Sequence, residues 1–407
     1  MIILQINSVC GQGSTGRISV ELADFLQREG HKCYIAYGHG TTSFKDSYKI
    51  GSRIENDFHN LFFTRLLGMH GRGTTFGTYR FLKWVDKIRP DIIHISNLHA
   101  NYINHPMLFK YIIKNNIPVV MTLHDCTNFT GSCSHYTTNR CYKWKTQCVN
   151  CAFHSQITSG SRYFDHTHII YNNRKDWYSK IKKLTVVAVS KWLEREAQQS
   201  ILMGNGHEIT HIYNWIDYKK FHRATNEEIN SFKEKYNLQE NVKYLITVSA
   251  SWNKKSTKFN DAVMLADKLP DDYKLILLGG LARGTKIPNT IIHIPYISEA
   301  NELSAAYSMA EAYIHFSVED TFGKVIAEAM SCGTIPITFN STACGEISGP
   351  YGFVVKPHDI EAILCSLTEL PNKKNEVHNM IEFVRSNYDY TSNASQYLKQ
   401  YKRLLSE

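Results

Sequence analysis

The sequence predicts an α/β protein built from two doubly wound, Rossmann-like domains. Two consecutive series of short apolar strands alternate with helical patterns, one before residue 214 and the other from about residue 243. Strands that alternate with helices form βαβ units, which assemble into parallel sheets with helices on both faces. The length of 407 residues agrees with two domains, because a domain commonly holds about 100–200 residues.

The first series of elements begins at the N-terminus. A helix is expected after the first strand because Ile18, Leu22, Phe25 and Leu26 recur at helical spacing. Residues 41–78 are harder to assign, since several glycines there would interrupt a long element. The expected strands are residues 2–9, 33–37, 91–96, 118–123 and 184–190, and the expected helices are residues 17–29 and 79–88.

The second series predicts a second parallel sheet. Its strands are expected at residues 244–248, 274–278, 290–294, 312–316, 335–339 and 352–355, with helices that include 261–269, 301–309 and 324–332. The resulting domains are residues 1–214 and 215–390, and an amphipathic helix over 391–407 is expected to cross back to the first domain. Ligands of such sheets bind at the carboxyl ends of the strands.

Composition narrows the function classes only partly. With 43% hydrophobic residues the chain can bury full-sized cores, which excludes a disordered protein. The sequence has no apolar run of the roughly 18 residues that a transmembrane helix needs. The N-terminus lacks the basic segment of a signal peptide, so a cytoplasmic protein is expected. The net charge of +9 would suit nucleic acid, an anionic membrane surface or an anionic small molecule.

A glycine-rich turn follows the first expected strand. Gly11, Gly13 and Gly16 match the spacing of a dinucleotide-binding loop. The second strand, however, runs into residues 36–40 without the acidic residue that such a site uses on the ribose. Two alternatives remain, a plain tight turn or a helix N-terminus at which Gly13 admits an anionic or polar ligand.

Two carboxylates flank the start of a helix in the second half. Asp320 comes just before a helix that begins near Gly323, and Glu328 lies on its second turn. A glycine at this position lets a ligand approach the first free N–H groups of the helix, where a phosphate is stabilised. The carboxylates would then accept hydrogen bonds from sugar or ribose hydroxyls. The alternative is that Asp320 caps the helix and Glu328 is a solvated surface residue.

This segment resembles the signature of family 4, or group 1, glycosyltransferases. These are retaining enzymes of the GT-B fold, in which two Rossmann-like domains face each other across a cleft. The family's first acidic residue is usually Glu; here Asp320 takes that place and Glu319 precedes it. The resemblance implies that Glu328 binds the nucleotide ribose and that Asp320 or Glu319 faces the donor sugar. It also implies that the backbone after Phe322 and Gly323 holds phosphate.

The resemblance extends over nearly the whole chain. Residues 90–99 resemble the fourth-strand segment of the family, and residues 122–125 resemble its mid-domain histidine motif. It implies that His124 lies beside the donor sugar, while Asn97, His99 and Asp125 belong to the acceptor side. A bacterial subset that makes capsular and extracellular polysaccharides is the most similar, because its members also carry cysteines after the histidine motif.

A lysine cluster follows the first strand of the second domain. The family places an arginine and a lysine there, at the donor diphosphate, and fixed positive charge at that point stabilises the leaving group. Lys254, Lys255 and Lys258 are available, and Lys255 fits the family spacing best, but the arginine is missing. The alternative is a solvated turn. Because lysine and a helix N-terminus can neutralise the diphosphate, no catalytic metal is expected.

Four cysteines lie close together in a predicted insertion at residues 126–154. Cys133, Cys141, Cys148 and Cys151 fall within nineteen residues, and four thiolates suit a structural Zn²⁺. Reduced buried cysteines and disulfides are the alternatives. The metal would make the insertion rigid beside His124, on the acceptor side.

The leading prediction is therefore an enzyme that transfers a sugar from a UDP- or GDP-sugar donor. Its acceptor would be a glycan or lipid-linked glycan in surface polysaccharide biosynthesis, reached by peripheral contact with the anionic inner face of the membrane. One alternative is a sugar-nucleotide epimerase of the same fold. Another is a zinc-stabilised, non-catalytic nucleic-acid-binding protein, but the basic residues are dispersed, so no nucleic-acid partner is expected.

Overall fold

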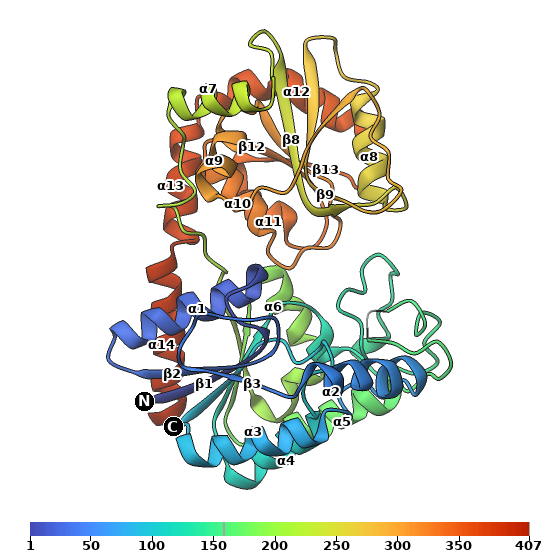
Figure 1. Ribbon diagram of the computed structural model, residues 1–407, viewed down its shortest axis with the longest axis vertical. Coiled ribbons are helices and arrows are strands. Elements are labelled where there is room, and N and C mark those ends of the chain that lie inside the picture. Colours follow the sequence, from blue (N-terminus) through green and yellow to red (C-terminus); the bar gives the residue numbers. More distant parts are fainter. Residues whose placement is uncertain (158, 407) are drawn as a thin grey trace. The chain divides into compact units, whose positions relative to one another are not determined.

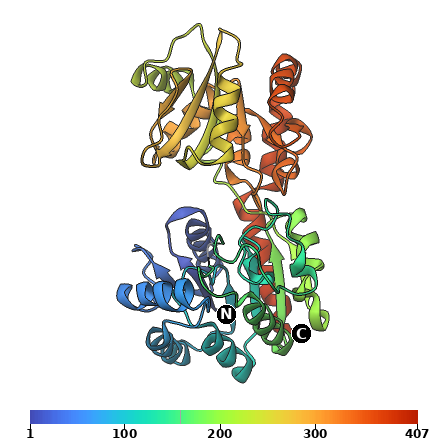
Figure 2. The same cartoon turned by 90° about the vertical axis from the view of Figure 1, so that its right-hand side faces the viewer.

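The computed structural model describes residues 1–157 and 159–406 and shows two compact units. Unit 1 comprises Met1–Tyr213 together with the C-terminal residues from Thr391 on, and unit 2 comprises Asn214–Tyr390. Each unit holds one parallel sheet with helices packed on it (Figures 1 and 2). In the described part of the chain, no helix combines the length and the apolar character that crossing a membrane requires.

Unit 1 contains a seven-stranded sheet within the described residues, in the order β3-β2-β1-β4-β5-β6-β7, and its strands pair in parallel. The order reverses between β1 and β4, which is the topological switch point of a doubly wound sheet. The strands are β1 (Ile2–Val9), β2 (Lys32–His39), β3 (Ser47–Lys49), β4 (Ile92–Ile95), β5 (Val119–Leu123), β6 (Leu184–Ala188) and β7 (Glu208–His211).

The sequence did not predict several helices of unit 1, and one of them lies in the region of residues 41–78 that was hard to assign. A helix is formed over Arg53–Phe58 and continues as a π-helix over His59–Leu66, since the glycines expected to break this region come after it. The helices are α1 (Gly13–Arg28), α2 (Arg53–Phe58), η1 (His59–Leu66), α3 (Thr75–Ile88), α4 (His105–Asn115), η2 (Thr127–Phe129), η3 (Lys143–Lys145), α5 (Thr167–Lys180), α6 (Lys191–Gln198), η4 (Ile201–Gly206) and α14 (Tyr390–Ser406).

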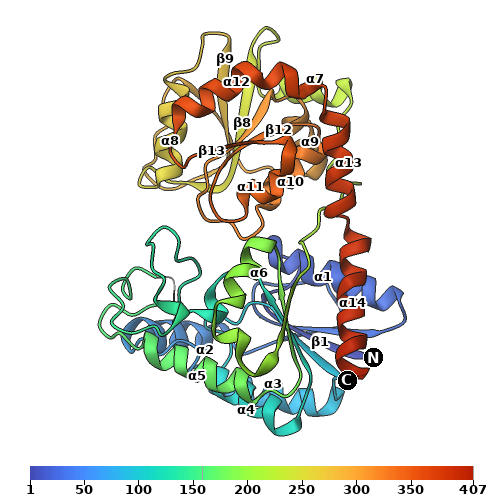
Figure 3. The same ribbon diagram turned by 180° about the vertical axis from the view of Figure 1, so that it is seen from behind.

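The last helix, α14, packs on unit 1 (Figure 3). Its Tyr401 hydroxyl is 2.7 Å from Nδ1 of His94 in β4, and Thr122 in β5 donates a hydrogen bond to the Tyr397 hydroxyl at 3.1 Å. All four side chains are buried. The C-terminal helix thus completes the core beside β4 and β5.

The cysteine-rich insertion rests on α5. The buried Arg174 donates hydrogen bonds to the carbonyl oxygens of Thr127 and Thr130, and the Tyr171 hydroxyl donates to the carbonyl oxygen of Trp144 at 2.9 Å. A buried guanidinium needs such partners, because an unpaired buried charge is costly. These bonds fix the start and the middle of the insertion to one helix.

Unit 2 has a six-stranded parallel sheet within the described residues, in the order β10-β9-β8-β11-β12-β13, which reverses between β8 and β11. The strands are β8 (Lys243–Trp252), β9 (Tyr273–Leu281), β10 (Ile291–Ile294), β11 (Ala312–His315), β12 (Ile335–Phe339) and β13 (Phe353–Val355). The helices are α7 (Asn226–Lys235), α8 (Thr257–Ala266), α9 (Ala300–Ser308), α10 (Lys324–Ser331), α11 (Cys344–Ser348), η5 (Gly349–Tyr351), α12 (Ile360–Lys374) and α13 (Val377–Asn387).

Candidate active site

The predicted site residues of both units gather at the carboxyl ends of the central strands. In unit 2 the segments after β8 and β11 flank the reversal of strand order, and in unit 1 the segments after β1 and β4 do so. Ligands of doubly wound sheets bind outside such a reversal because the loops diverge there and leave room. Each unit therefore carries one candidate binding edge.

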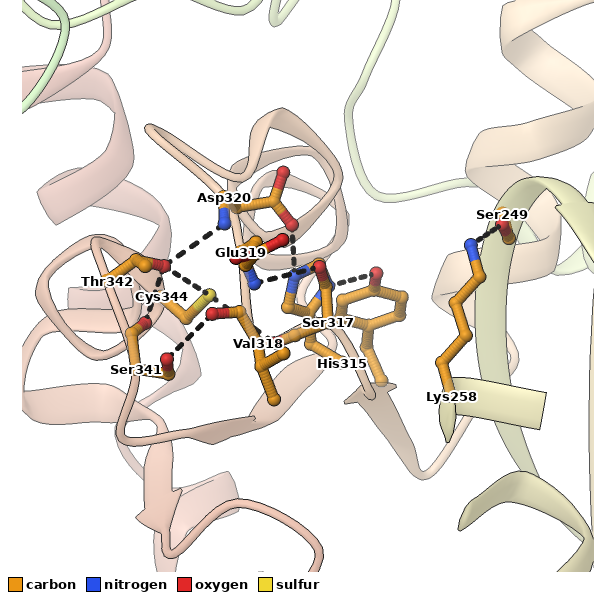
Figure 4. A network of polar contacts seen from close by, with 11 residues as sticks. Ser249, Lys258, His315, Ser317, Val318, Glu319, Asp320, Ser341, Thr342 and Cys344 are labelled. Atoms are coloured by element: carbon orange, nitrogen blue, oxygen red, sulfur yellow. Dashed lines mark hydrogen bonds and ion pairs between the residues drawn. The ribbon is translucent and has the colours of Figure 1, made fainter. Parts of the chain in front are cut away.

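Asp320 follows β11 and is held from two sides (Figure 4). Nε2 of His315 donates to its Oδ2 at 2.8 Å, and its backbone N–H donates to Oγ1 of Thr342 at 3.1 Å. The N-cap residue of α10 is Gly323, three positions later, so Asp320 does not occupy the cap position. Its carboxylate is about a third exposed, so a ligand in solution can reach it.

His315 is the buried partner that orients this carboxylate. Its ring is 5% exposed, and Nδ1 lies 2.9 Å from the hydroxyl of Tyr313. Burial alone would lower the pKa of His315, but Tyr313, Cys344 and Asp320 outweigh it and raise this pKa well above its ordinary value. A protonated ring donates from both nitrogens, so the Asp320 carboxylate stays ionised and fixed in direction.

Lys258 is the lysine that the structure brings toward Asp320. Its Nζ donates to Oγ of Ser249 at 2.5 Å and lies 5.4 Å from the ring centre of Trp252 (Figure 4). Burial lowers the pKa of Lys258, while the charge of Asp320 acts in the opposite direction. Lys254 and Lys255, which the family spacing favours, are exposed in the turn between β8 and α8.

The N-terminus of α10 is open to an anion. Gly323 has φ 73°, and a Cβ there would lie 2.8 Å from Cδ1 of Ile326, so glycine is required. The first turn of α10, which begins at Lys324, contains no acidic residue. Free N–H groups and the helix dipole favour a negative ligand at this point. Phe322 is buried and packs edge-on against Tyr388 at 5.2 Å, which fixes the loop before the helix.

Glu328 is buried on α10, with 8% of its surface exposed. The alternative that it is a solvated surface residue is therefore wrong. Together with burial, its charge raises the pKa of Cys332 to about 12 and also raises the pKa of Tyr307. Glu319 lies in the same loop as Asp320, and its backbone N–H donates to Oγ of Ser317 at 3.3 Å.

In unit 1 the glycine loop forms an open helix end. Gly13 is the first residue of α1 and has φ 62°, and a Cβ there would have no atom within 4 Å. The N-cap residue, Gln12, makes no side-chain cap hydrogen bond, and the first turn has no acidic residue. Gly16 is crowded instead, because a Cβ would lie 3.1 Å from Cγ2 of Val9.

The histidine motif of unit 1 forms an ion pair at the carboxyl edge. Nε2 of His99, after β4, lies 3.0 Å from Oδ2 of Asp125, after β5. Burial opposes the charged form of each group, but the pair outweighs it, raising the pKa of His99 and lowering that of Asp125. Burial lowers the pKa of His124 to about 4, so this ring is neutral at physiological pH. Asn97 is buried nearby on the segment after β4.

The four predicted metal ligands lie in one region of the insertion. Burial, aided by Cys141 and Cys151, raises the pKa of the Cys148 thiol to about 11. Burial lowers the pKa of Arg174, and Cys148 and Cys133 are among the groups that oppose this lowering. All ten cysteines lie in the described part of the chain, and none of them forms a disulfide bond. Within the described residues, however, no three of these four sulfur atoms lie within 4.8 Å of one another, so the structure does not bring them to the spacing of a tetrahedral Zn²⁺ site.

A second group of metal-type ligands was not expected from the sequence. One ligand atom each from His315, Asp320 and Cys344 lies within 4.8 Å of the others. The hydrogen bond between His315 and Asp320 already uses two of these atoms. A histidine within an otherwise apolar strand, five positions before an acidic residue, is the sequence signal that would have revealed this pair.

Two family models match the chain along most of its length. Residues 15–220 match the model described as Glycosyltransferase Family 4, and residues 217–387 match the model described as Glycosyl transferases group 1. The chain belongs to glycosyltransferase family 4. The first match alone covers half of the chain and contains the histidine motif, and the second contains both carboxylates of α10 and its preceding loop.

Curated relatives match this family 4 glycosyltransferase over parts of their length. O-antigen chain mannosyltransferase B of Escherichia coli is 35% identical over 87 residues, which is 21% of this chain and 22% of the relative. N-acetyl-alpha-D-glucosaminyl L-malate synthase of Bacillus anthracis is 24% identical over 233 residues, 54% of this chain and 58% of the relative. The chain thus spans less than two thirds of these relatives.

Solved structures match the whole fold. A glycosyltransferase from Rickettsia africae has a TM-score of 0.72 and 19% identity, covering 99% of this chain and 98% of its own. Anabaena HepE in complex with UDP and glucose has a TM-score of 0.67 and 14% identity, covering 99% and 100%. At this identity the likeness concerns the fold, and the predicted GT-B class with two doubly wound parallel sheets is confirmed.

Proposed function

We propose that this glycosyltransferase moves a sugar from a nucleotide-sugar donor to a glycan or lipid-linked glycan acceptor, with retention at the anomeric carbon. The observation that carries the proposal is the edge of unit 2, where an open helix N-terminus lies between two carboxylates near a half-buried lysine. Anion-binding and hydroxyl-binding groups side by side are what a nucleotide sugar needs, since it joins a diphosphate to a ribose and a sugar.

The donor would be held by separate groups for each of its parts. We assign the diphosphate to the N-terminus of α10 at Gly323 and to Lys258, with Lys254 and Lys255 at the rim. As the bond to the sugar breaks, negative charge grows on the diphosphate, and fixed positive groups stabilise that transition state. Glu328 would accept hydrogen bonds from the ribose.

The sugar would be bound by the loop before α10. We assign its hydroxyl groups to Asp320, whose direction is set by His315, with Glu319 beside it. Asp320 is one methylene shorter than the glutamate usual in the family, and a buried histidine fixes where its oxygen can reach. This combination would make the loop selective for the position of a sugar hydroxyl.

Unit 1 would supply the acceptor side. We propose that neutral His124 hydrogen-bonds the donor sugar during transfer, since a ring with a pKa of about 4 keeps one acceptor nitrogen at physiological pH. The ion pair of His99 with Asp125, together with Asn97, would bind acceptor hydroxyls. The open helix end at Gly13 would admit a polar part of either substrate.

The nucleotide and the pathway are inferred from the relatives. HepE was solved with UDP and glucose, which favours UDP over GDP. The O-antigen mannosyltransferase favours a role in surface polysaccharide, capsular or extracellular, made in the cytoplasm at the inner face of the membrane. We further propose that transfer needs no catalytic metal and that the insertion cysteines hold a structural Zn²⁺.

Donor binding tests the proposal first. In thermal unfolding with UDP, GDP and their sugars, a donor at about 100 times its Kd should stabilise the protein by about 2.7 kcal/mol. UDP and a UDP-sugar are expected to raise Tm, and Glu328→Ala is expected to abolish the shift. Unchanged nucleotide affinity in that variant would overturn the ribose assignment.

Transfer assays test the roles of the other residues. His124→Ala and Asp320→Ala are each expected to abolish transfer while the fold stays intact, although Asp320→Ala should lower Tm because it removes a partner of the buried His315. Activity that persists in excess EDTA would support transfer without a catalytic metal, whereas loss restored by Mg²⁺ would refute it. Metal analysis of protein purified without a histidine tag checks the zinc site, and less than stoichiometric zinc would disprove it.

A further inference from the structure

The helical stretch α2–η1 buries several polar side chains and exposes large apolar ones. Asn56, His59 and Thr64 are at most 3% exposed, whereas Phe58 is 55% and Leu61 is 71% exposed. A surface helix ordinarily shows the reverse pattern. The inverted distribution of polar and apolar side chains extends along the helical segment and is not limited to one side chain.

Hydrogen bonds fix the rotation of this helix. Nδ1 of His59 lies 2.9 Å from Oγ1 of Thr74, and the N–H of Gly71 donates to Nε2 of His59 at 3.1 Å. Thr64 donates to Oδ1 of Asn101 at 2.6 Å. Rotating the helix to bury its apolar side chains would break all three hydrogen bonds and leave their polar groups without these partners. The fold therefore keeps the apolar side chains exposed.

The exposed side forms a continuous apolar surface. The rings of Phe58 and Phe62 stack at 5.3 Å, and Phe62 and Leu66 are 38% and 40% exposed. Scattered exposed apolar residues are normal on a soluble protein, but contiguous ones mark an interaction site. We call this surface, with the two aromatic residues described next, the α2–η1 face.

The segment that follows the cysteine insertion extends the α2–η1 face. Oγ of Ser161 donates to the carbonyl oxygen of Leu66 at 2.9 Å and accepts the N–H of Tyr163 at 3.0 Å. In this turn, which Ser161 ties to η1, Tyr163 and Phe164 are 66% and 49% exposed. A groove of about 620 Å³ lies between Tyr163 and the helix.

The charge around the α2–η1 face is positive. Arg65 and Arg162 line the groove, and among the described residues no acidic side chain lines it. The sequence from 126 to 164 contains four basic residues and no acidic one. The nearest exposed acid on the helix, Asp57, is paired with Arg53 at 3.6 Å.

We propose that the α2–η1 face binds an anionic phospholipid bilayer. Aromatic and leucine side chains held outward, with arginines at their edge, are the composition of segments that lie in the interface of a membrane. Anionic headgroups are attracted by the basic rim, and this attraction is screened by salt. The inference rests on the proposed function, because a lipid-linked acceptor is met at a membrane.

Vesicle sedimentation of the full chain tests the proposal. The wild type should bind vesicles of phosphatidylglycerol and phosphatidylcholine and bind phosphatidylcholine alone more weakly, with affinity falling as salt rises. The double variant Phe58→Ser, Leu61→Ser should lower the partition coefficient by about tenfold or more. Arg162→Gln should weaken binding to the anionic vesicles and reduce its salt dependence.

A matched variant on unit 2 provides the control. Met264 and Tyr296 are 49% and 63% exposed, so Met264→Ser, Tyr296→Ser removes comparable apolar surface and should bind vesicles as the wild type does. Equal binding by the Phe58→Ser, Leu61→Ser variant, or no binding by the wild type, overturns the proposal.

Two further readouts separate the alternatives. If sedimentation velocity shows an oligomer for the wild type and a monomer for the Phe58→Ser, Leu61→Ser variant, the α2–η1 face binds a second copy of the chain and the membrane proposal is wrong. The donor-induced Tm shift is measured on the same variants. If the wild type shows the donor-induced Tm shift but does not bind vesicles, the membrane proposal is refuted and the proposed donor is not. If the wild type shows no Tm shift, the proposed donor is refuted.

Discussion

The carboxyl edges of the two sheets share one topology and differ in their electrostatics. In unit 1 the edge holds one histidine–carboxylate ion pair, His99 with Asp125, but the edge and the core behind it also hold histidines that burial keeps neutral, such as His94 and His124. In unit 2 the buried histidine, His315, is charged and paired with a carboxylate that stands near a lysine. The same strand order thus carries two chemistries, because the loops at the edge, and not the sheet, set the site.

The largest expected effect is a difference in how the two units respond to acid. Burial lowers the pKa of His59 to about 4 and those of His94 and His105 to about 3. Below pH 6.5 the unfolded chain therefore binds more protons at these sites, and stability falls as the pH drops toward the folded-state values. Each should cost about 2 kcal/mol between pH 6.5 and 5.

His315 in unit 2 has the opposite sign. Its folded-state pKa is raised, so its contribution is fully present below about pH 6.5 and is lost as the pH rises through the folded-state value. Urea unfolding followed by limited proteolysis and mass spectrometry reports each unit separately. Unit 1 is expected to lose stability between pH 7 and 5, whereas unit 2 is not. Equal losses of stability in the two units would contradict the proposed electrostatic difference between them.

The second prediction concerns the charge at the edge of unit 2. Lys258→Met keeps the side chain's length over Trp252 but removes its charge, and should lower kcat by about 10²–10³-fold. Lys255→Met is the matched control in the exposed turn, where solvent screens the charge, and should lower kcat less. Steady-state kinetics with a UDP-sugar measures both, and a larger loss in the control would restore the assignment made from family spacing.

The third prediction tests whether His315 positions Asp320. His315→Gln keeps a donor but removes the charge, and should raise the donor KM by about tenfold with a smaller change in kcat. In the wild type, KM should rise as the pH increases through the pKa of His315, whose neighbours are Tyr313, Cys344 and Asp320. A pH profile in the variant that follows the wild type would contradict this role.

The smallest effect is expected at the glycine loop of unit 1. Gly13→Ala has open space for its Cβ, so only the left-handed backbone should matter, at about 1 kcal/mol. Gly16→Ala meets Val9 and should destabilise more. If Gly13→Ala lowers kcat/KM well beyond its change in stability, measured by urea unfolding, the loss reports a ligand at the helix end.

Elements buried on both sides were the best predicted. The sequence places β1 at residues 2–9 and β12 at 335–339, the bounds that the structure shows, because runs of isoleucine and valine favour a buried strand. The helix with Glu328 differs by one residue at its end. Local composition alone sets such elements, so the sequence suffices.

The parts that the sequence did not predict depend on the assembled fold. The α2–η1 helix was missed because His59–Leu66 is a π-helix, in which the residues on one side do not follow the 3.6-residue spacing of an α-helix. Lys258 ranked below Lys255 because spacing along the chain does not show which lysine packs on Trp252. His315 was overlooked because its partner lies beyond the end of its strand, at a distance set by the loop.

The packing of α14 has a consequence for the synthesis of this protein. Tyr397 and Tyr401 supply partners to Thr122 and His94, yet they are translated after all of unit 2. While unit 2 is being translated, His94 and the neighbouring strands of unit 1 therefore lack the α14 side chains that cover them in the folded protein. Unit 1 can complete its core only after α14 has been synthesised. The unit whose synthesis begins first is thus the one whose folding is completed last.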